Sequence, residues 1–212
     1  MKKLLWILPC LALVAALPSR ADTAKVEQPN ELVKAVSGEI LPLLKAKHAY
    51  YSADPNRLYA MVNARILPYF DFRKMSQYVL GLSWRQATEA QKQRFADEFR
   101  KLLVRTYATA LLRYNDQKIV YLPYTGSPTD RIVIVKTKIE QTNGQASIPI
   151  YFTFYNYNPG WKVFDVTIDG VSLVTNYRKV YGQRIQQEGL DAVINGLAAQ
   201  NRKAESVASK KK

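Results

Sequence analysis

Apolar residues recur at helical spacing through the first half of the chain. The first such stripe consists of Leu32, Val33, Val36 and Ile40. We expect Pro42 to kink or end this helix, because a proline inside a helix removes a backbone hydrogen bond. Asp54 followed by Pro55 predicts the start of another helix. Asp71 predicts the N-terminal cap of a further helix, and Gly81 its C-terminal end.

The pattern changes after a long helix that begins at the capping-box pair Thr88 and Gln91 and runs towards Tyr114. Four segments rich in β-branched and aromatic residues follow, at 119–122, 132–139, 148–157 and 161–168. They predict an antiparallel meander. Helical spacing returns after the turn Asp169-Gly170 and is interrupted at Gly189. The sequence therefore predicts an α+β domain in which helices cover one face of a four-stranded antiparallel sheet.

The predicted sheet has one strongly apolar face. In the third strand it is formed by Ile148, Ile150, Phe152 and Phe154, and in the fourth by Phe164, Val166 and Ile168. The second strand is apolar on both sides and gives no direction. Such a face has to be covered. A packed core is the commoner reason for this pattern, but an apolar cavity between sheet and helices leaves the same pattern in the sequence.

Composition narrows the chemistry. The chain of 212 residues has one histidine, His48, and one cysteine, Cys10, so it lacks the ligands of a Cys and His zinc site and the pairs of a disulfide framework. It contains neither a P-loop nor a G-x-G-x-x-G pattern, which argues against a nucleotide site, and we expect no cofactor and no metal. A net charge of +14 favours anionic surfaces.

The first residues have the three parts of a secretory signal peptide. A basic start is followed by an uncharged apolar stretch from Leu4 to Leu17 and by a small-x-small ending at Ala21. We therefore expect a signal peptide at 1–21, one domain at 22–200 and a basic disordered tail at 201–212. Export predicts a soluble periplasmic protein, and it argues against nucleic acid as a partner.

Two ordered motif blocks resemble a known family. The first runs from Leu67-Pro-Tyr-Phe-Asp-Phe-Arg-Lys-Met through Gly81-Leu-Ser-Trp84, and the second is Trp161-Lys-Val-Phe-Asp-Val-Thr-Ile-Asp-Gly-Val-Ser-Leu-Val174. Together they are similar to the MlaC or toluene-tolerance family, the auxiliary component of a phospholipid-transporting ABC system. The resemblance implies an NTF2-like fold around an apolar pocket that holds the acyl chains of a diacyl phospholipid.

The resemblance also implies partners: an inner-membrane ABC lipid transporter with a lipid-binding ring, and an outer-membrane lipoprotein in complex with a porin. Such a carrier is no enzyme, and it maintains the lipid asymmetry of the outer membrane. Combining the resemblance with the apolar face, we predict one pocket wall from the sheet and a second from helices, formed by Ile150, Phe152, Phe154, Phe164, Val166 and Ile168, and by Leu103, Tyr107 and Val174.

Two other interpretations remain open. The same stripes also suit a periplasmic interaction module with a solid core and no lipid cargo. A lipid hydrolase would need a base beside Ser172, and no second histidine supports one. Asp165 lies in the middle of a strand, where we expect a structural carboxylate paired with an arginine or a tyrosine.

Overall fold

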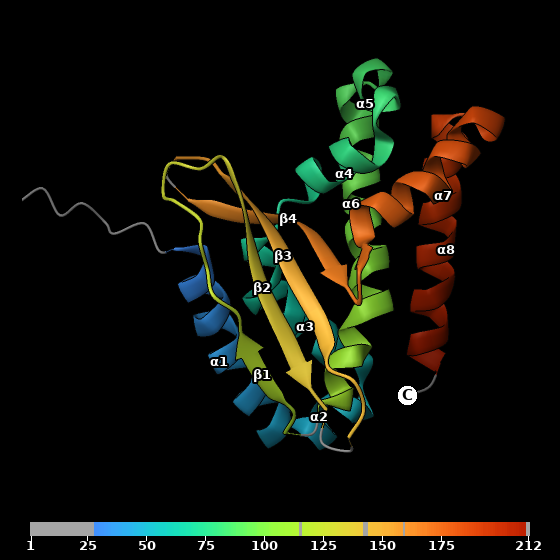
Figure 1. Cartoon of the computed structure of the whole chain (residues 1–212). Helices are drawn as coiled ribbons and strands as arrows, with labels where there is room; N and C mark the ends of the chain where they lie inside the picture. The colour runs from blue at the N-terminus through green and yellow to red at the C-terminus, as the bar shows by residue number, and fades with distance from the viewer. Residues whose placement is uncertain (1–27, 115, 142–143, 159, 211–212) are drawn as a thin grey trace, which may run out of the picture.

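The computed structural model describes residues 28–114, 116–141, 144–158 and 160–210 (Figure 1). The expected signal peptide at 1–21 lies outside these residues. The helices are α1 (Pro29–Ala46), α2 (His48–Ala53), α3 (Pro55–Arg65), α4 (Phe72–Leu80), α5 (Leu82–Gln86), α6 (Glu89–Tyr107), α7 (Leu173–Glu188) and α8 (Leu190–Lys210), with 3-10 turns η1 (Leu67–Tyr69) and η2 (Ala108–Arg113). In this part of the chain no helix is both long and apolar enough to span a membrane.

The predicted helix ends are confirmed. Asp54 and Asp71 each accept a hydrogen bond from a backbone amide of the turn that they cap, at 3.0 and 2.8 Å. Thr88 and Gln91 form the predicted capping box at the start of α6. Gly81 ends α4 with a φ of 56°, a conformation that favours glycine because it has no Cβ. These boundaries follow from short-range contacts, which is why sequence patterns locate them well.

Pro42 was predicted to kink or end the first helix, and it does not end it. α1 continues past Pro42 to Ala46, and the buried side chains of Ile40 and Leu44 hold it against the domain on either side of the proline. The expected disordered tail is also corrected, because α8 continues through residues 201–210. Asn201, where the tail was predicted to begin, is buried. In both cases tertiary contacts outweigh the local signal.

The sheet contains the four predicted strands, β1 (Lys118–Tyr121), β2 (Ile132–Glu140), β3 (Ile148–Asn156) and β4 (Trp161–Ile168), and a short fifth, β5 (Val171–Ser172). All neighbours pair antiparallel in the order β1-β2-β3-β4-β5. Asp169 and Gly170 join β4 to β5, and both have positive φ, as in a tight two-residue hairpin turn. The α+β class and the meander are confirmed, with this one added strand.

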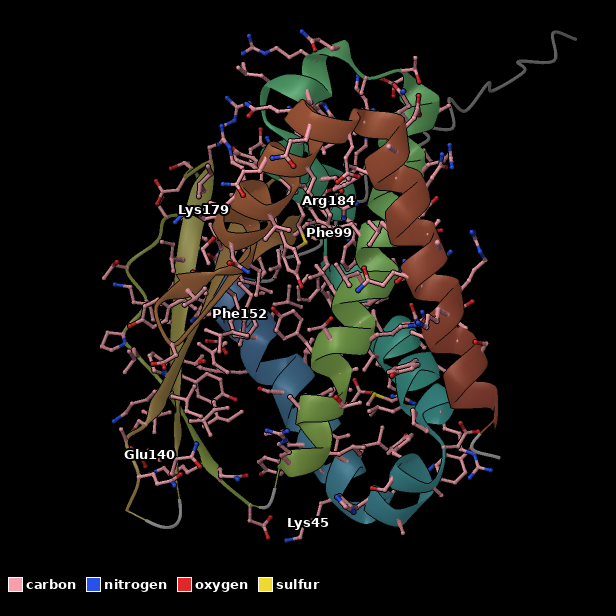
Figure 2. The ribbon with its side chains drawn as sticks, turned by 90° about the vertical axis from the view of Figure 1, so that its right-hand side faces the viewer. Lys45, Phe99, Glu140, Phe152, Lys179 and Arg184 are labelled. Carbon is pink, nitrogen blue, oxygen red and sulfur yellow. The ribbon has the colours of Figure 1, made fainter. Side chains whose placement is uncertain are left out.

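The helices and the sheet form layers. Figure 2 shows the sheet on one side of the molecule, α6 in the middle and α8 on the other side. Buried residues of β2, β3 and β4 pack with Leu32 of α1 and Leu173, and we call this group the sheet-side cluster. Buried residues of α4, α6, α7 and α8 form a second group, the helical cluster, which includes Phe95 and Phe99. A third group lies among α1, α2, α3 and the end of α6.

Candidate functional site

Strand pairing decides which side chains share the face of the sheet that packs on α1. Val133, Val135 and Thr137 of β2 lie opposite Phe154, Phe152 and Ile150 of β3. On the other side of β3, Phe152 pairs with Val166 and Ile150 with Ile168. We call this the inner face. The structure shows which side of β2 faces the helices, a choice that the sequence left open. Val133 and Val135 are buried on the inner face, while Ile132 and Ile134 are exposed on the outer face.

The two ends of the inner face differ in burial. At one end Phe154 is 1% and its partner on β2, Val133, 5% exposed. At the other end the apolar side chains remain half-buried, and we call them the half-buried end: Ile119, Ile139, Ile148, Ile150, Phe152 and Ile168. In Figure 2, Phe152 lies between the sheet and the helices, with Glu140 of the sheet layer and Lys45 of the helical layer further towards the same end of the molecule.

Half-burial of this kind is energetically unfavourable in a protein that binds nothing there. Apolar surface left in contact with water costs about 25 cal/mol per Å² relative to burial. Phe154, at the other end of the same face, is almost completely buried, so the two ends are not packed equally. An apolar ligand inserted along the inner face would cover the half-buried side chains. The packing therefore favours the half-buried end as a place where an apolar ligand could bind.

Tyr107, near the end of α6, connects the two main clusters. Its ring packs against both the sheet-side and the helical cluster. Burial and a hydrogen bond with Tyr177 raise the pKa of Tyr107 to about 12, so its hydroxyl stays uncharged at neutral pH. The side chain thus presents an apolar ring to the inner face while its polar end is already paired. Val33 and Val36 of α1 also pack against the sheet-side cluster.

Tyr124 brings a polar atom to the sheet-side cluster. Its hydroxyl is buried and has no hydrogen-bond partner within the described part of the chain, and burial raises the pKa of this side chain. The backbone passes over it at Gly126, where a Cβ would lie 2.4 Å from the Tyr124 hydroxyl oxygen. Gly126 is therefore required for this close approach. An unpaired buried hydroxyl costs about 1–3 kcal/mol, so it offers a donor to any polar group that reaches it.

The structure divides the residues predicted to line the pocket. Those in or against the sheet-side cluster are Tyr107, Ile150, Phe152, Phe154, Val166 and Ile168. Leu103, Phe164 and Val174 belong to the helical cluster instead, where they pack among helices. The predicted helical wall therefore keeps only Tyr107 on the sheet side, and α1 supplies its other side chains.

Phe164 was assigned to the wrong face. The register shifts between Thr153 and Phe154, so Phe154 pairs with Val163 and Phe164 is the extra residue of a bulge. Its ring packs 5.1 Å from that of Tyr78 and 6.4 Å from that of Tyr155, centroid to centroid, on the outer side of β4. Alternation along β4 predicts the opposite, because a bulge depends on pairing between strands and leaves no signal in one strand.

Several inner-face residues were missed by the sequence argument. Val133 and Val135 belong to the wall, but β2 is apolar on both sides and gave no direction. Ile119 and Ile139 pair with each other at the half-buried end. Only the registers of β1 with β2 and of β2 with β3 reveal that they continue the face of Ile148, and no single-strand pattern contains a register.

Asp165 has different partners from those expected. Its Oδ2 accepts a hydrogen bond from the hydroxyl of Ser172 at 2.6 Å, and its Oδ1 accepts one from the backbone amide of Val174 at 3.0 Å. Ser172 also caps α7 by accepting from the amide of Thr175. Neither an arginine nor a tyrosine pairs with this carboxylate in the described residues. The pair fastens the start of α7 to β4.

Comparison with known proteins agrees with this architecture. The family model described as MlaC protein matches residues 34–199. The chain belongs to the MlaC family. Among relatives in this family, the toluene tolerance protein ttg2D of Pseudomonas putida is 32% identical over 201 residues, covering 93% of this chain and 92% of that protein. The intermembrane phospholipid transport system binding protein MlaC of Haemophilus influenzae is 28% identical over 187 residues, covering 87% of each.

A solved structure extends the MlaC comparison to the fold. The phospholipid-binding protein from Ralstonia solanacearum, determined in complex with a phospholipid, matches with a TM-score of 0.76 and 26% identity. The match covers 84% of this chain and 98% of that one. The family resemblance inferred from the two motif blocks is confirmed by these comparisons.

Proposed function

We propose that this protein is a phospholipid carrier that holds acyl chains along the inner face of the sheet. The observation that carries the proposal is the half-buried end, where apolar side chains of β1, β2, β3 and β4 remain incompletely covered. The family relatives named for phospholipid binding and the phospholipid complex of the Ralstonia protein support the same cargo. Of the nine residues predicted from the sequence to line the pocket, we assign to it the six that lie in or against the sheet-side cluster.

The energetics explain why such a carrier is needed. Each buried methylene is worth about 0.8 kcal/mol, so a chain of some 15 methylenes exposes roughly 12 kcal/mol of unfavourable surface in water. A carrier must cover the chains and leave the polar head in solvent, because desolvating the head is costly. The inner face supplies apolar cover. Tyr124 packs against the sheet-side cluster, and we assign its buried hydroxyl, unpaired within the described residues, to a lipid oxygen.

The cellular role is part of the same proposal. We place the carrier in the periplasm, after removal of the signal peptide at 1–21. It would move phospholipid between an outer-membrane lipoprotein-porin complex and an inner-membrane ABC transporter with a lipid-binding ring, and so maintain outer-membrane lipid asymmetry. Because the sequence contains no P-loop to couple transport to ATP, direction would come from the partners' relative affinities for lipid.

We propose a binding role and no catalysis. The Ser172 hydroxyl donates to Asp165 and caps α7, which leaves it committed to structure. The single histidine, His48, places its Nε2 2.9 Å from the carbonyl oxygen of Leu112, at the junction of α2 with η2. Within the described residues, the carboxylate in hydrogen-bond reach of this serine is Asp165, and its other oxygen accepts from the backbone amide of Val174, so both groups hold the start of α7 in place. Turnover of a phospholipid ester that is lost in Ser172→Ala would contradict this part of the proposal.

Extraction of the purified protein tests the cargo. After mild purification, organic solvent should release diacyl phospholipid in an amount that mass spectrometry relates to the protein. An extract without phospholipid, from protein that also fails to take up lipid from vesicles, would favour the interaction module with a solid core.

A further inference from the structure

A cleft of about 510 Å³ lies on the other side of the sheet from the acyl-chain site, between α4, α5, α7 and the paired ends of β2 and β3. Four cations line it, Lys74, Arg85, Arg131 and Arg178, and no carboxylate does. We call it the basic cleft. Ile132 and Tyr155, which also line it, pair with each other and project from the outer face. The basic cleft and the half-buried end therefore share no residue.

The cations of the basic cleft are held in place by uncharged groups. The guanidinium of Arg178 packs on Gly81, where a Cβ would lie 3.1 Å from its nearest nitrogen. Lys74 places its Nζ 3.5 Å from the centre of the Tyr155 ring, and Arg131 donates from Nε to the Tyr155 hydroxyl at 2.7 Å. These contacts orient the cations without neutralising their charge.

None of the four cations has a carboxylate within ion-pair distance in the described part of the chain. Nearby Arg73 differs, because it pairs with Glu89 at 2.5 Å. Like charges gathered in one concavity repel each other, and an anion that binds between them removes that repulsion. Arginine forks are suited to bidentate contact with carboxylates and phosphates. The cleft thus has the chemistry of an anion site.

The surroundings decide which kind of anion fits. Leu82, on α5, is 75% exposed, and Ile132 is 46% exposed at the opposite side of the cleft. Tyr78 and Trp84 complete the lining. Arginine, tyrosine and tryptophan around exposed apolar residues are the composition of protein interfaces. A flat bilayer would contact the protruding Leu82 without entering the concavity, and inorganic phosphate would leave the apolar residues uncovered.

We propose that the basic cleft is the docking site for an acidic segment of a partner protein that also carries apolar side chains. Its carboxylates would meet Arg131 and Arg178, and its apolar side chain would cover Leu82 or Ile132. This inference deepens the proposed carrier function by naming the surface through which the carrier meets a protein partner. The inference rests on the proposed function in one respect, because a lipid carrier has to bind the proteins that deliver and receive its lipid.

A titration of isotope-labelled protein tests the site. The probe is a short synthetic peptide of glutamates and leucines, followed by amide chemical shifts. We expect shifts confined to α4, α5, the start of β2 and α7, with an affinity that falls as salt is added. Replacing both arginines, Arg131→Gln with Arg178→Gln, should weaken binding by about a hundredfold, since each charged hydrogen bond contributes about a factor of ten.

A matched variant controls for overall charge. Lys118→Gln with Lys179→Gln also removes two positive charges, and neither lysine lines the cleft; Lys179 is labelled in Figure 2. This variant should keep most of the affinity. The variant Arg178→Lys, which keeps the charge, should retain more binding than Arg178→Gln. A difference between these two variants reports the charge at position 178 and not a loss of folded protein.

Four outcomes would overturn the proposal: no shifts at millimolar peptide, shifts outside the cleft, equal loss in the control, or cleft shifts produced instead by phosphatidylglycerol vesicles or inorganic phosphate. Bound phospholipid, measured by extraction, should be unchanged in every variant. Peptide binding by a protein without lipid would contradict the carrier function and leave the docking site intact. Bound lipid in a protein that does not bind the peptide would contradict the docking site and leave the carrier function intact.

Discussion

Phe152 and Phe154 lie two residues apart on the inner face of β3, yet only one of them is fully packed. Phe154 is 1% exposed, whereas Phe152 is half-buried. Overpacking a solid core costs about 1–3 kcal/mol. Phe154→Trp should therefore lower the free energy of unfolding by about that amount. Phe152→Trp should leave the free energy of unfolding of the lipid-free protein nearly unchanged while reducing the phospholipid that copurifies.

Urea unfolding of both variants, together with lipid extraction, distinguishes the two positions. Because the residues share a strand, a face and the same substitution, each serves as the control for the other. Equal destabilisation by the two tryptophans, with lipid content unaltered, would show that the half-buried end is packed core.

Tyr181 gives a prediction about pH at the residue scale. It is 4% exposed in the helical cluster, and burial raises its pKa to about 12 from 10.0 in the unfolded chain. The folded protein thus holds this proton more tightly than the unfolded chain. The contribution to stability is fully present below pH 10 and is lost as the pH rises towards 12.

The size of this effect follows from the shift of about two pKa units, which corresponds to an upper value of about 3 kcal/mol. Tyr181→Phe removes the titrating group. The free energy of unfolding of the wild type, minus that of the variant, should fall between pH 10 and pH 12 in denaturant titrations. A difference that stays constant over that range would contradict the assignment.

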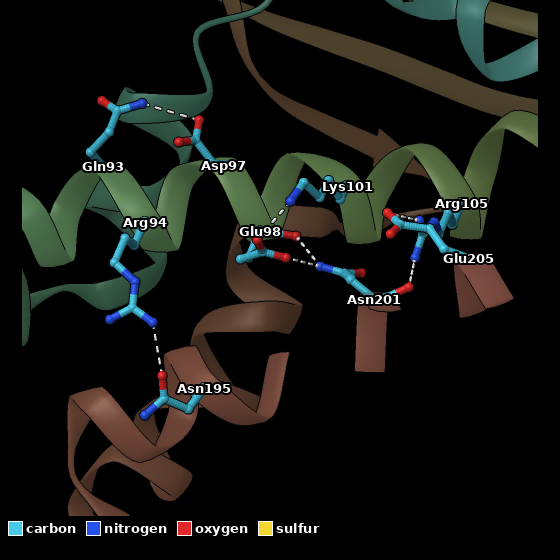
Figure 3. Close-up of polar contacts among 9 residues, drawn as sticks. All are labelled: Gln93, Arg94, Asp97, Glu98, Lys101, Arg105, Asn195, Asn201 and Glu205. Carbon is cyan, nitrogen blue, oxygen red and sulfur yellow. Dashed lines mark hydrogen bonds and ion pairs between the residues drawn. The ribbon is translucent and has the colours of Figure 1, made fainter. Parts of the chain in front are cut away.

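At the scale of elements, α8 is fastened to α6 by polar contacts along its length (Figure 3). Asn201 is 2% exposed, and its Nδ2 donates to the backbone oxygen of Glu98 at 2.9 Å and to its Oε2 at 2.7 Å. Arg105 of α6 donates to the carbonyl of Asn201 and to Glu205. These contacts explain why the helix continues where a disordered tail was predicted.

Asn201→Ala should lower the free energy of unfolding by about 1–3 kcal/mol, because it leaves buried acceptors without a donor. Asn195→Ala is the control on the same helix: this residue accepts from Arg94 at 2.8 Å but is exposed, so the loss should stay within about 0.5 kcal/mol. Thermal or chemical unfolding measures both. A smaller loss for Asn201→Ala than for Asn195→Ala would contradict the proposed fastening.

The same elements show what sequence alone could predict. The caps at Asp54, Asp71 and Thr88 and the four predicted strands leave patterns within a few residues, so local sequence located them. The bulge that turns Phe164 to the outer face and the burial of Asn201 depend on partners far along the chain. The half-burial of Phe152 depends on how closely other elements pack on the inner face, and the pattern of one strand contains no information on this.

At the scale of the whole molecule, the sheet separates two surfaces of opposite character. The inner face is apolar and half-buried at one end, while the basic cleft lies on the outer side beside α4, α5 and α7. The cargo site and the docking site that we propose therefore use different residues. Substitutions in one surface should leave the other unchanged, since distant sites act almost independently.

Lipid should also stabilise the whole domain, because a ligand that binds only the folded state shifts unfolding by mass action. Protein stripped of lipid under mild conditions should unfold at a lower temperature than the purified form, and added phospholipid should restore the higher value. Calorimetry of the two forms checks this. Identical transitions before and after stripping, with lipid removal verified by mass spectrometry, would contradict a bound cargo.

The most direct test of the carrier is photo-crosslinking with a phospholipid that carries a diazirine in its acyl chain, followed by peptide mapping. We predict crosslinks in the β3 and β4 peptides, at Ile150, Phe152 or Ile168, and at Tyr107 of α6. Crosslinks confined to the helical cluster around Phe99, or none in protein that has taken up the probe, would contradict an acyl-chain site on the inner face.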